Sequence, residues 1–209
     1  MSKDGITNIV VAGFPYNDIN VIVDVLAETA VESGISCTGM SLNTRDTFGV
    51  RPSSYQLRLG DKARGAYIPV GEGDLLLGLE AGCAVRAAAE TMGANATAVI
   101  NTWQYHPPHL VQYPTIDQML EKLGQLVGRV IPVDGPRLGE EAGDRRISQG
   151  LVDMALFGAF CGTGVLPFPS SAVEHVIRER YRFQEGASEE RILKAFTLGL
   201  ASTKATIAA

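Results

Sequence analysis

Cysteine is scarce in this 209-residue sequence, and its three cysteines lie far apart. Cys37, Cys83 and Cys161 form no Cys-x-x-Cys pair, the spacing that iron–sulfur and structural zinc sites commonly use. All three stand among apolar or small residues, as reduced buried thiols do. We therefore expect no metal site and no iron–sulfur cluster held by this chain alone, and a reducing, cytoplasmic environment.

Long hydrophobic runs and basic clusters are missing as well. No apolar stretch reaches the roughly 18 residues of a membrane span. The opening residues, MSKDGITN, lack the apolar segment of a signal peptide. The net charge is −5 and no basic run exceeds two residues. We therefore expect neither a membrane nor a nucleic acid as a partner.

Histidine is also rare, and its three positions predict no metal or catalytic site. His106 and His109 are separated by Pro107 and Pro108, which exclude the helical spacing that would bring both rings to one metal. His175 lies among alternating charges in a predicted helix. The Gly-x-Ser-x-Gly motif of serine hydrolases is absent. We therefore predict no catalytic residue in this chain.

What the sequence does contain is an alternation of strand and helix patterns. The apolar run 8–14 is typical of a strand buried on both faces. Helical spacing begins at Ile19, with Asp18 as the expected N-cap and Gly34 as the stop. A second strand is predicted over 35–42, and a right-handed crossover into a parallel sheet is the default connection.

The middle of the chain departs from this alternation. Residues 53–60 alternate apolar and polar, and residues 61–70 turn and continue extended, which predicts a half-exposed antiparallel hairpin or edge excursion. The charged segment 137–148 is interpreted as a solvated loop that leads into a helix. Further strands are predicted over 73–80, 97–103 and 129–135, and further helices over 81–92, 115–127, 147–161, 171–181 and 188–201. The sequence thus predicts an α/β fold with a Rossmann-like, open, mostly parallel sheet, an antiparallel hairpin excursion and a helical C-terminal third.

The loop after the first strand lacks most of the glycines that a dinucleotide-binding loop uses. Such glycines let the backbone approach a pyrophosphate, whose charge faces the amides of the next helix. Here Gly13 stands alone: Pro15 removes one amide, and Asp18 puts a negative charge at the helix start. Both features disfavour an anion, so a plain turn between strand and helix is the simpler interpretation of this pattern.

Three motifs follow one another between Ile68 and Glu90. They read Pro-x-Gly-x-Gly-Asp, Leu-x-Gly-x-Glu and Ala-x-Arg, on Pro69, Gly71, Gly73, Asp74, Gly78, Glu80, Ala84 and Arg86. An Asn-Thr pair at 101–102, the segment 133–169 and Ala-Phe-x-x-Gly at 195–199 follow in order. Together they cover most of the chain and resemble the γ-type domain of 2-oxoacid:ferredoxin oxidoreductases. The resemblance is closest to the stand-alone β subunit of the indolepyruvate enzymes.

The resemblance implies one γ-type domain over residues 1–209, acting as a subunit of a larger enzyme. Such enzymes decarboxylate a 2-oxoacid on thiamine diphosphate, pass electrons through [4Fe–4S] clusters to ferredoxin, and transfer the acyl group to coenzyme A. The thiamine diphosphate and the clusters belong to other domains. The resemblance therefore implies a hetero-oligomer with a thiamine diphosphate/iron–sulfur catalytic subunit, and ferredoxin as an indirect partner.

For this chain itself, the resemblance implies that it completes or shapes the partner's active site for an indolepyruvate-like or other aryl substrate. We expect no cofactor bound by this chain alone, with coenzyme A as the one candidate, and no activity of the isolated chain.

Two loops depart from the family pattern. Residues 13–18 replace the usual Gly-x-Gly-Gly-Gln-Gly, and Gly49-Val50-Arg51 replaces an Arg-Gly-Gly. The resemblance implies that both loops face the active site or the coenzyme. The candidate substrate- or cofactor-binding residues are therefore Gly13, Phe14, Tyr16, Asn17 and Arg51.

Two alternatives remain open. A stand-alone nucleotide- or coenzyme A-binding Rossmann-like protein would use Gly13 and the helix after it, and would bind NAD, FAD, ATP or coenzyme A in a calorimetric titration. An assembly module without ligand binding would tolerate changes at Tyr16, Asn17 or Arg51 with no effect on the kinetics of the assembled enzyme.

Overall fold

The structure is a computed structural model that describes residues 5–42, 53–106, 112–143, 148–182 and 188–208. Its elements in chain order are β1 (Thr7–Gly13), α1 (Ile19–Glu32), β2 (Cys37–Ser41), β3 (Ser53–Leu59), β4 (Gly73–Gly78), α2 (Ala81–Thr91), β5 (Met92–Asn101), α3 (Ile116–Leu126), β6 (Arg129–Val133), α4 (Gly135–Ala142), α5 (Gln149–Cys161), α6 (Ser170–Tyr181) and α7 (Ser188–Ala208).

The strands form one sheet in the order β2-β3-β1-β4-β5-β6. Strands β1, β4, β5 and β6 pair in parallel, and β3 runs antiparallel to both of its neighbours. The predicted α/β class and mostly parallel sheet are confirmed. Since the parallel strands share a direction, their carboxyl ends lie along one edge of the sheet.

The antiparallel excursion is present as strand β3, but residues 61–70 do not form a second strand of a hairpin with it. Strand β3 pairs with β2 and with β1, where Ser53 faces Gly13, and residues 61–70 contain no strand. Gln56 instead accepts the backbone N–H of Ile68 at 2.7 Å, so a side chain holds that segment. Strands β1 and β2 are parallel to each other, but β3 lies between them.

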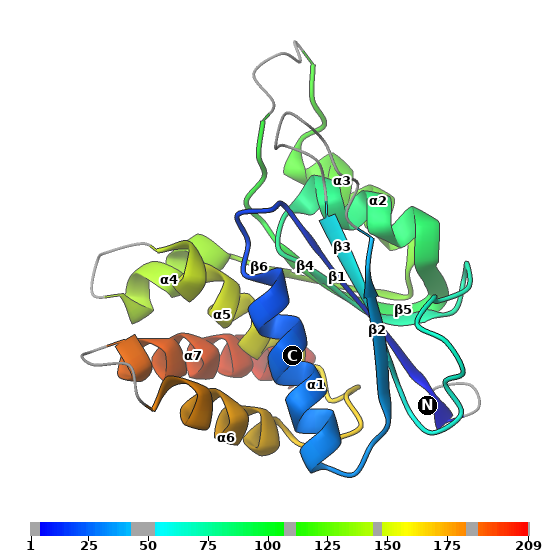
Figure 1. Cartoon of the computed structure of the whole chain (residues 1–209). Coiled ribbons are helices and arrows are strands. Elements are labelled where there is room, and N and C mark those ends of the chain that lie inside the picture. The colour runs from blue at the N-terminus through cyan, green and yellow to red at the C-terminus, as the bar shows by residue number, and fades with distance from the viewer. Residues whose placement is uncertain (1–4, 43–52, 107–111, 144–147, 183–187, 209) are drawn as a thin grey trace.

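Helices cover both faces of the sheet. Figure 1 shows α1 and α5–α7 on one side, and α2 and α3 on the other. Alternate residues of β1 supply the two cores: Val11 packs in the cluster with Phe157, and Val10 packs in the cluster with Leu123. Every residue of β1 is buried, as the continuous apolar run predicts.

The helical C-terminal third is packed closely at two glycines. A Cβ on Gly158 of α5 would overlap the backbone of Phe196, and a Cβ on Gly199 of α7 would overlap the carbonyl of Ala155. The Ala-Phe-x-x-Gly motif thus serves the contact between α5 and α7. Within the described residues, no helix combines the length and apolar character needed to cross a bilayer.

The charged segment 137–148 differs in part from its prediction, because residues 137–142 belong to the short helix α4; residues 144–147 lie outside the described residues. Asp134 caps this helix by accepting the N–H of Arg137 at 3.1 Å, and Pro136 stands in its first turn. An N-cap aspartate followed by proline is a local signal for the start of a helix. The prediction from the mixed charges and glycines of this segment did not take it into account.

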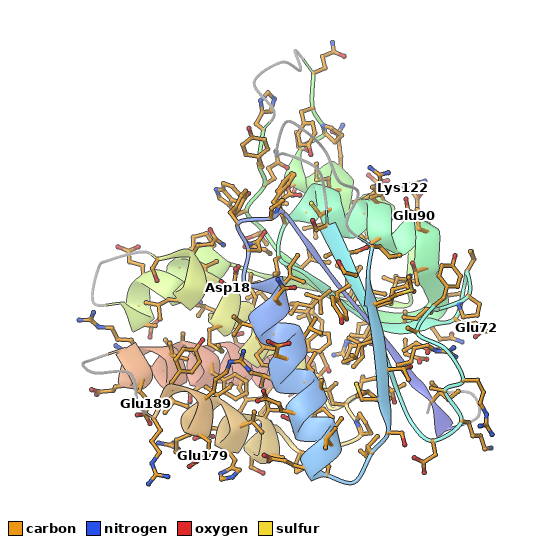
Figure 2. The ribbon with its side chains drawn as sticks, in the orientation of Figure 1. Asp18, Glu72, Glu90, Lys122, Glu179 and Glu189 are labelled. Atoms are coloured by element: carbon orange, nitrogen blue, oxygen red, sulfur yellow. The ribbon has the colours of Figure 1, made fainter. Side chains whose placement is uncertain are left out.

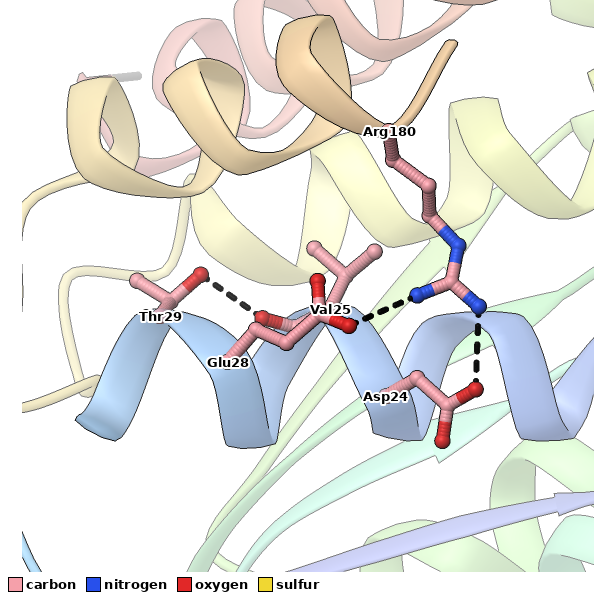
Figure 3. Close-up of polar contacts among 5 residues, drawn as sticks. All are labelled: Asp24, Val25, Glu28, Thr29 and Arg180. Carbon is pink, nitrogen blue, oxygen red and sulfur yellow. Dashed lines mark hydrogen bonds and ion pairs between the residues drawn. The ribbon is translucent and has the colours of Figure 1, made fainter. Parts of the chain in front are cut away.

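Helix α1 is fastened to α6 along its solvent side. Arg180 donates to Glu28 and to Asp24, each at 3.0 Å, while the hydroxyl of Thr29 donates to the carbonyl of Val25 within α1 (Figure 3). These contacts hold α1 at residues 24–29, and none of them involves its first turn.

Candidate functional site

The candidate site lies at the carboxyl edge of the sheet, where the chain leaves neighbouring strands in opposite directions. After β1 the chain enters α1 on one face, and after β4 it enters α2 on the other. Ligands of open α/β sheets bind in the crevice at such a switch point. The loop 14–18 and the turn at Leu79 and Glu80 border this crevice.

Asn17 closes the loop after β1. Its Oδ1 accepts the N–H of Phe14 at 2.8 Å, and its own N–H donates to the carbonyl of Phe14 at 3.0 Å. A Cβ on Gly13 would lie 2.8 Å from Asn17 Oδ1 and 3.2 Å from the Cβ of Leu79. The side chain of Asn17 therefore explains the glycine at position 13, and a phosphate is not needed to explain it.

Asp153 of α5 holds this loop in place by hydrogen bonds to Asn17 and Asp18. Its Oδ1 accepts the Asn17 Nδ2 at 2.9 Å and the Gln149 Nε2 at 2.8 Å, and its Oδ2 accepts the N–H of Asp18 at 2.8 Å. Complete burial raises the pKa of Asp153 to about 6, although these three bonds act against the rise. The sequence analysis missed Asp153, whose signal is a single charge among the apolar residues 151–161.

Asp18 occupies the N-cap position of α1, as predicted, but its side chain makes no capping bond. Figure 2 labels it at the start of that helix. Its backbone N–H is bound by Asp153, and burial raises the pKa of its carboxyl group. The first turn of α1 is thus held by a remote residue.

Glu80 holds the turn after β4. The side chain is wholly buried; its Oε2 accepts the N–H of Cys83 at 2.8 Å, which caps α2, and its Oε1 accepts the N–H of Tyr105 at 3.1 Å. Beside it, Asn101 donates to the carbonyl of Leu79 at 3.0 Å. Glu80 and Asn101, both positions of the family motifs, therefore tie the ends of β4 and β5 together.

Aromatic rings lie over these buried polar groups. Phe14 stacks on Tyr16 with centroids 5.6 Å apart, and meets Tyr105 edge-on at 5.4 Å. Tyr16 is 47% exposed and Trp103 is 42% exposed. Partial burial, with Glu80 as the next cause, raises the pKa of Tyr16 to about 12. The edge presents an aromatic surface with a hydroxyl donor.

The structure places four of the predicted site residues together, Gly13 at the end of β1 and Phe14, Tyr16 and Asn17 in the loop that follows. The fifth, Arg51, lies outside the described residues. Both polar ends of the Asn17 side chain are engaged within the chain, and Phe14 is buried, so Tyr16 is the most accessible of the four.

The same loop is poorly suited to hold a phosphate. The N–H groups of Phe14, Asn17 and Asp18 are bonded within the chain, and Pro15 has none. Anion binding at a helix start needs such groups free. This geometry counts against the stand-alone nucleotide-binding alternative.

The side chains that commonly bind metals do not gather into a metal site in the described part of the chain. No three His, Cys, Asp or Glu side chains among the described residues converge to hold a metal ion. Cys83 and Cys161 are free and buried on opposite faces of the sheet, and burial raises the pKa of both thiols. His109 lies outside the described residues.

Comparison by sequence gives two findings. A model of the family described as "Pyruvate ferredoxin/flavodoxin oxidoreductase" matches residues 8–202. The chain is 30% identical over 180 residues to indolepyruvate oxidoreductase subunit IorB of Archaeoglobus fulgidus, covering 82% of this chain and 84% of the relative.

Comparison by structure gives neighbours at 16–19% identity, which show the fold. Pyruvate oxidoreductase subunit PORC of Thermotoga maritima has a TM-score of 0.66, covering 95% of this chain and 97% of that one. The keto/oxoacid ferredoxin oxidoreductase γ subunit of Geobacter sulfurreducens has 0.67, covering 97% and 99%. The 2-oxoglutarate:ferredoxin oxidoreductase of Magnetococcus marinus, described with 2-oxoglutarate, coenzyme A and succinyl-CoA bound, has 0.69, covering 97% of this chain and 32% of that chain.

Proposed function

This chain belongs to the pyruvate ferredoxin/flavodoxin oxidoreductase family, and we propose that it is a subunit of a multi-subunit 2-oxoacid:ferredoxin oxidoreductase. In this proposal residues 1–209 form one γ-type domain in the cytoplasm. The name of the Archaeoglobus relative supports an indolepyruvate-like or other aryl 2-oxoacid as the substrate. The chain completes or shapes the active site and supplies no catalytic residue.

The cofactors that drive the reaction belong to a partner chain in this proposal. The partner carries thiamine diphosphate, which supplies the decarboxylation, and the [4Fe–4S] clusters that pass electrons to ferredoxin. The separate burial of Cys83 and Cys161 supports placing the clusters outside this chain. Coenzyme A is a candidate acyl acceptor, because one structural neighbour is described with it bound. The bonded N–H groups of Phe14, Asn17 and Asp18 favour a site elsewhere for its phosphates.

The observation that carries the substrate proposal is the aromatic surface at the carboxyl edge. Tyr16 is exposed there, and Phe14 supports it from below. Gly13 and Asn17 shape the loop, and Arg51 remains a predicted contact. Aromatic rings pair with one another by offset stacking or edge-to-face contact, so this surface suits a flat aryl side chain.

The assembly test is co-expression with the thiamine diphosphate-binding subunit. The tagged chain is expected to co-purify with that subunit as one complex that reduces ferredoxin with indolepyruvate. The chain purified alone is expected to give no turnover. Turnover by the isolated chain, or its failure to enter a complex, would overturn the proposal.

The site test is the substitution Tyr16→Ala in the assembled enzyme. We expect KM for an aryl 2-oxoacid to rise about three- to tenfold, the worth of one aromatic contact, with a smaller change for pyruvate. The matched control is Tyr67→Ala. Tyr67 is also exposed, but its carbonyl accepts a bond from Arg58, which pairs with Asn8 at the opposite end of β1. Equal effects of the two substitutions would exclude a site role for Tyr16.

A further inference from the structure

Asp153 is an unusual residue for its place in the fold. Helix α5 is buried on all sides from Leu151 to Cys161, and Asp153 is the one charged side chain in that stretch. The cost of burying a charge is several kcal/mol unless donors compensate it. An apolar residue would pack α5 at less cost, so the carboxylate calls for an explanation beyond packing.

The hydrogen bonds show what a carboxylate does here that an amide cannot. Both oxygens of Asp153 act as acceptors, toward Asn17, Gln149 and the N–H of Asp18. An ionised carboxylate only accepts, so it faces the NH₂ group of Asn17 and turns the Oδ1 of Asn17 toward the N–H of Phe14. Asp153 therefore selects one of the two orientations of that amide.

The effect reaches the aromatic surface through two short links. Asn17 fixes Phe14 by one bond in each direction, and Phe14 stacks on Tyr16. The bond from Asp18 to Asp153 sets the first turn of α1 at the same time. The position of Tyr16 is thus linked to a side chain 137 residues later in the sequence, by a continuous series of contacts.

We propose that Asp153 is a positioning residue, which orients Asn17 and the start of α1 so that Phe14 and Tyr16 hold one fixed arrangement at the carboxyl edge. The consequence for substrate rests on the proposed function. The positioning itself does not, and it can be measured on the isolated chain.

The experiment measures amide hydrogen exchange by NMR in the full chain. In Asp153→Asn, an NH₂ group faces donors, and we expect exchange at Phe14, Asn17 and Asp18 to become about tenfold faster or more. The substitution also removes a buried charge, so global stability needs its own control. Exchange in the middle of β4 provides it and is expected to stay unchanged. Asp153→Ala is made in parallel, so that one folded variant is available.

The reciprocal exchange of the two residues supplies the sharpest outcome. Asn17→Asp alone sets two carboxyl groups against each other and is expected to loosen the loop further. In Asn17→Asp/Asp153→Asn, the residue at 153 donates to the residue at 17 and still accepts from Asp18, while Gln149 can turn its amide. We expect this double variant to recover most of the lost protection.

The matched control is Asp74→Asn. Like Asp153, Asp74 is a carboxylate that accepts a backbone N–H, that of Asn8 at 2.8 Å, but it is only partly buried and lies at the opposite end of β1. It is expected to leave exchange in the loop 14–18 unchanged.

Three results would overturn the positioning role. They are unchanged loop exchange in Asp153→Asn and Asp153→Ala, equal acceleration in the loop and in β4, and no recovery in the double variant. In the assembled enzyme, Asp153→Asn is expected to raise KM for the aryl 2-oxoacid more than it lowers kcat. If loop exchange accelerates as expected and the kinetics do not change, positioning stands and the proposed substrate contact is wrong.

Discussion

Helices α1 and α2 both begin at the carboxyl edge of the sheet, but their first turns are held in opposite ways. Helix α2 begins directly after β4, and Glu80 caps it by accepting the N–H of Cys83, three residues ahead. Helix α1 begins after the loop 14–18, and its cap residue Asp18 contributes no side-chain bond. The N–H of Asp18 is bound by Asp153, 135 residues away.

The first turn of α2 is therefore held by a residue close in sequence, and the first turn of α1 is held by a residue distant in sequence. The first turn of α2 is capped by Glu80 from three residues away, although Glu80 also accepts the N–H of Tyr105 after β5. The loop 14–18 depends on the placement of α5, which itself packs against α7 through Gly158 and Gly199. A change in the packing of the C-terminal helices can therefore reach the aromatic surface at Tyr16 through the bonds of Asp153, whereas the capping bond of α2 involves no residue of those helices.

The largest expected effect on the free energy of unfolding comes from removing Glu80, the residue that caps α2. Glu80→Ala leaves the buried N–H of Cys83 and the partly buried N–H of Tyr105 without their acceptor. We expect a loss of about 3–4 kcal/mol in the free energy of unfolding, from two orphaned donors and a lost cap. Urea denaturation measures it.

The control for that prediction is Thr115→Ala in the exposed capping box of α3, where Thr115 accepts the N–H of Gln118 at 3.3 Å. We expect about 1 kcal/mol there. Comparable losses in the two variants would show that Glu80 acts as an ordinary helix cap and does not also join β4 to β5.

The same contrast explains which features the sequence could predict. The span of β1, the helix after it and the helix after Glu80 follow from hydrophobic period and short-range signals, and the structure has all three. The pairing of β3 with β2 and the anchoring of Asn17 by Asp153 join distant segments. Local pattern carries no information on which segments meet, so both were missed.

Gly13 has a role in the structure that its sequence pattern does not indicate. As a lone glycine after a strand it indicates a phosphate loop only weakly. In the structure its missing side chain leaves space for the amide of Asn17, whose own bonds close the loop. The sequence placed Gly13, Phe14, Tyr16 and Asn17 in one loop, but only the contacts distinguish the exposed Tyr16 from the residues that shape the loop.

The second-largest expected effect is the pH dependence that Asp153, which holds the start of α1, gives to the free energy of unfolding. The pKa of Asp153 is about 6 in the folded chain against an ordinary 3.8, so the folded state binds more protons between these values. The free energy of unfolding should therefore fall as pH rises from about 4 to about 6, by on the order of 2–3 kcal/mol. The raised pKa of Asp18 acts in the same direction.

Urea denaturation of wild type and Asp153→Asn at pH 4.5 and pH 7 checks this slope, which the variant should lose in large part. Loop exchange, corrected for its intrinsic pH dependence, should move the other way in the wild type. Protonated Asp153 accepts fewer bonds, so the loop loosens at low pH while the whole chain becomes more stable. Equal slopes in the two proteins would contradict the assignment to Asp153.

The smallest expected effect is that of Asp18→Ala. A negative charge at a helix start is favourable by about 0.3–1 kcal/mol. Asp18, however, makes no capping bond, and its charge raises the pKa of nearby Asp153, so repulsion between the two offsets the gain. We expect a change of about 0.5 kcal/mol or less in urea denaturation, with a lower pKa of Asp153 in a carboxyl-carbon NMR titration. A loss as large as that of Glu80→Ala would mean that α1 is capped by its own sequence, and the contrast between the two helix starts would disappear.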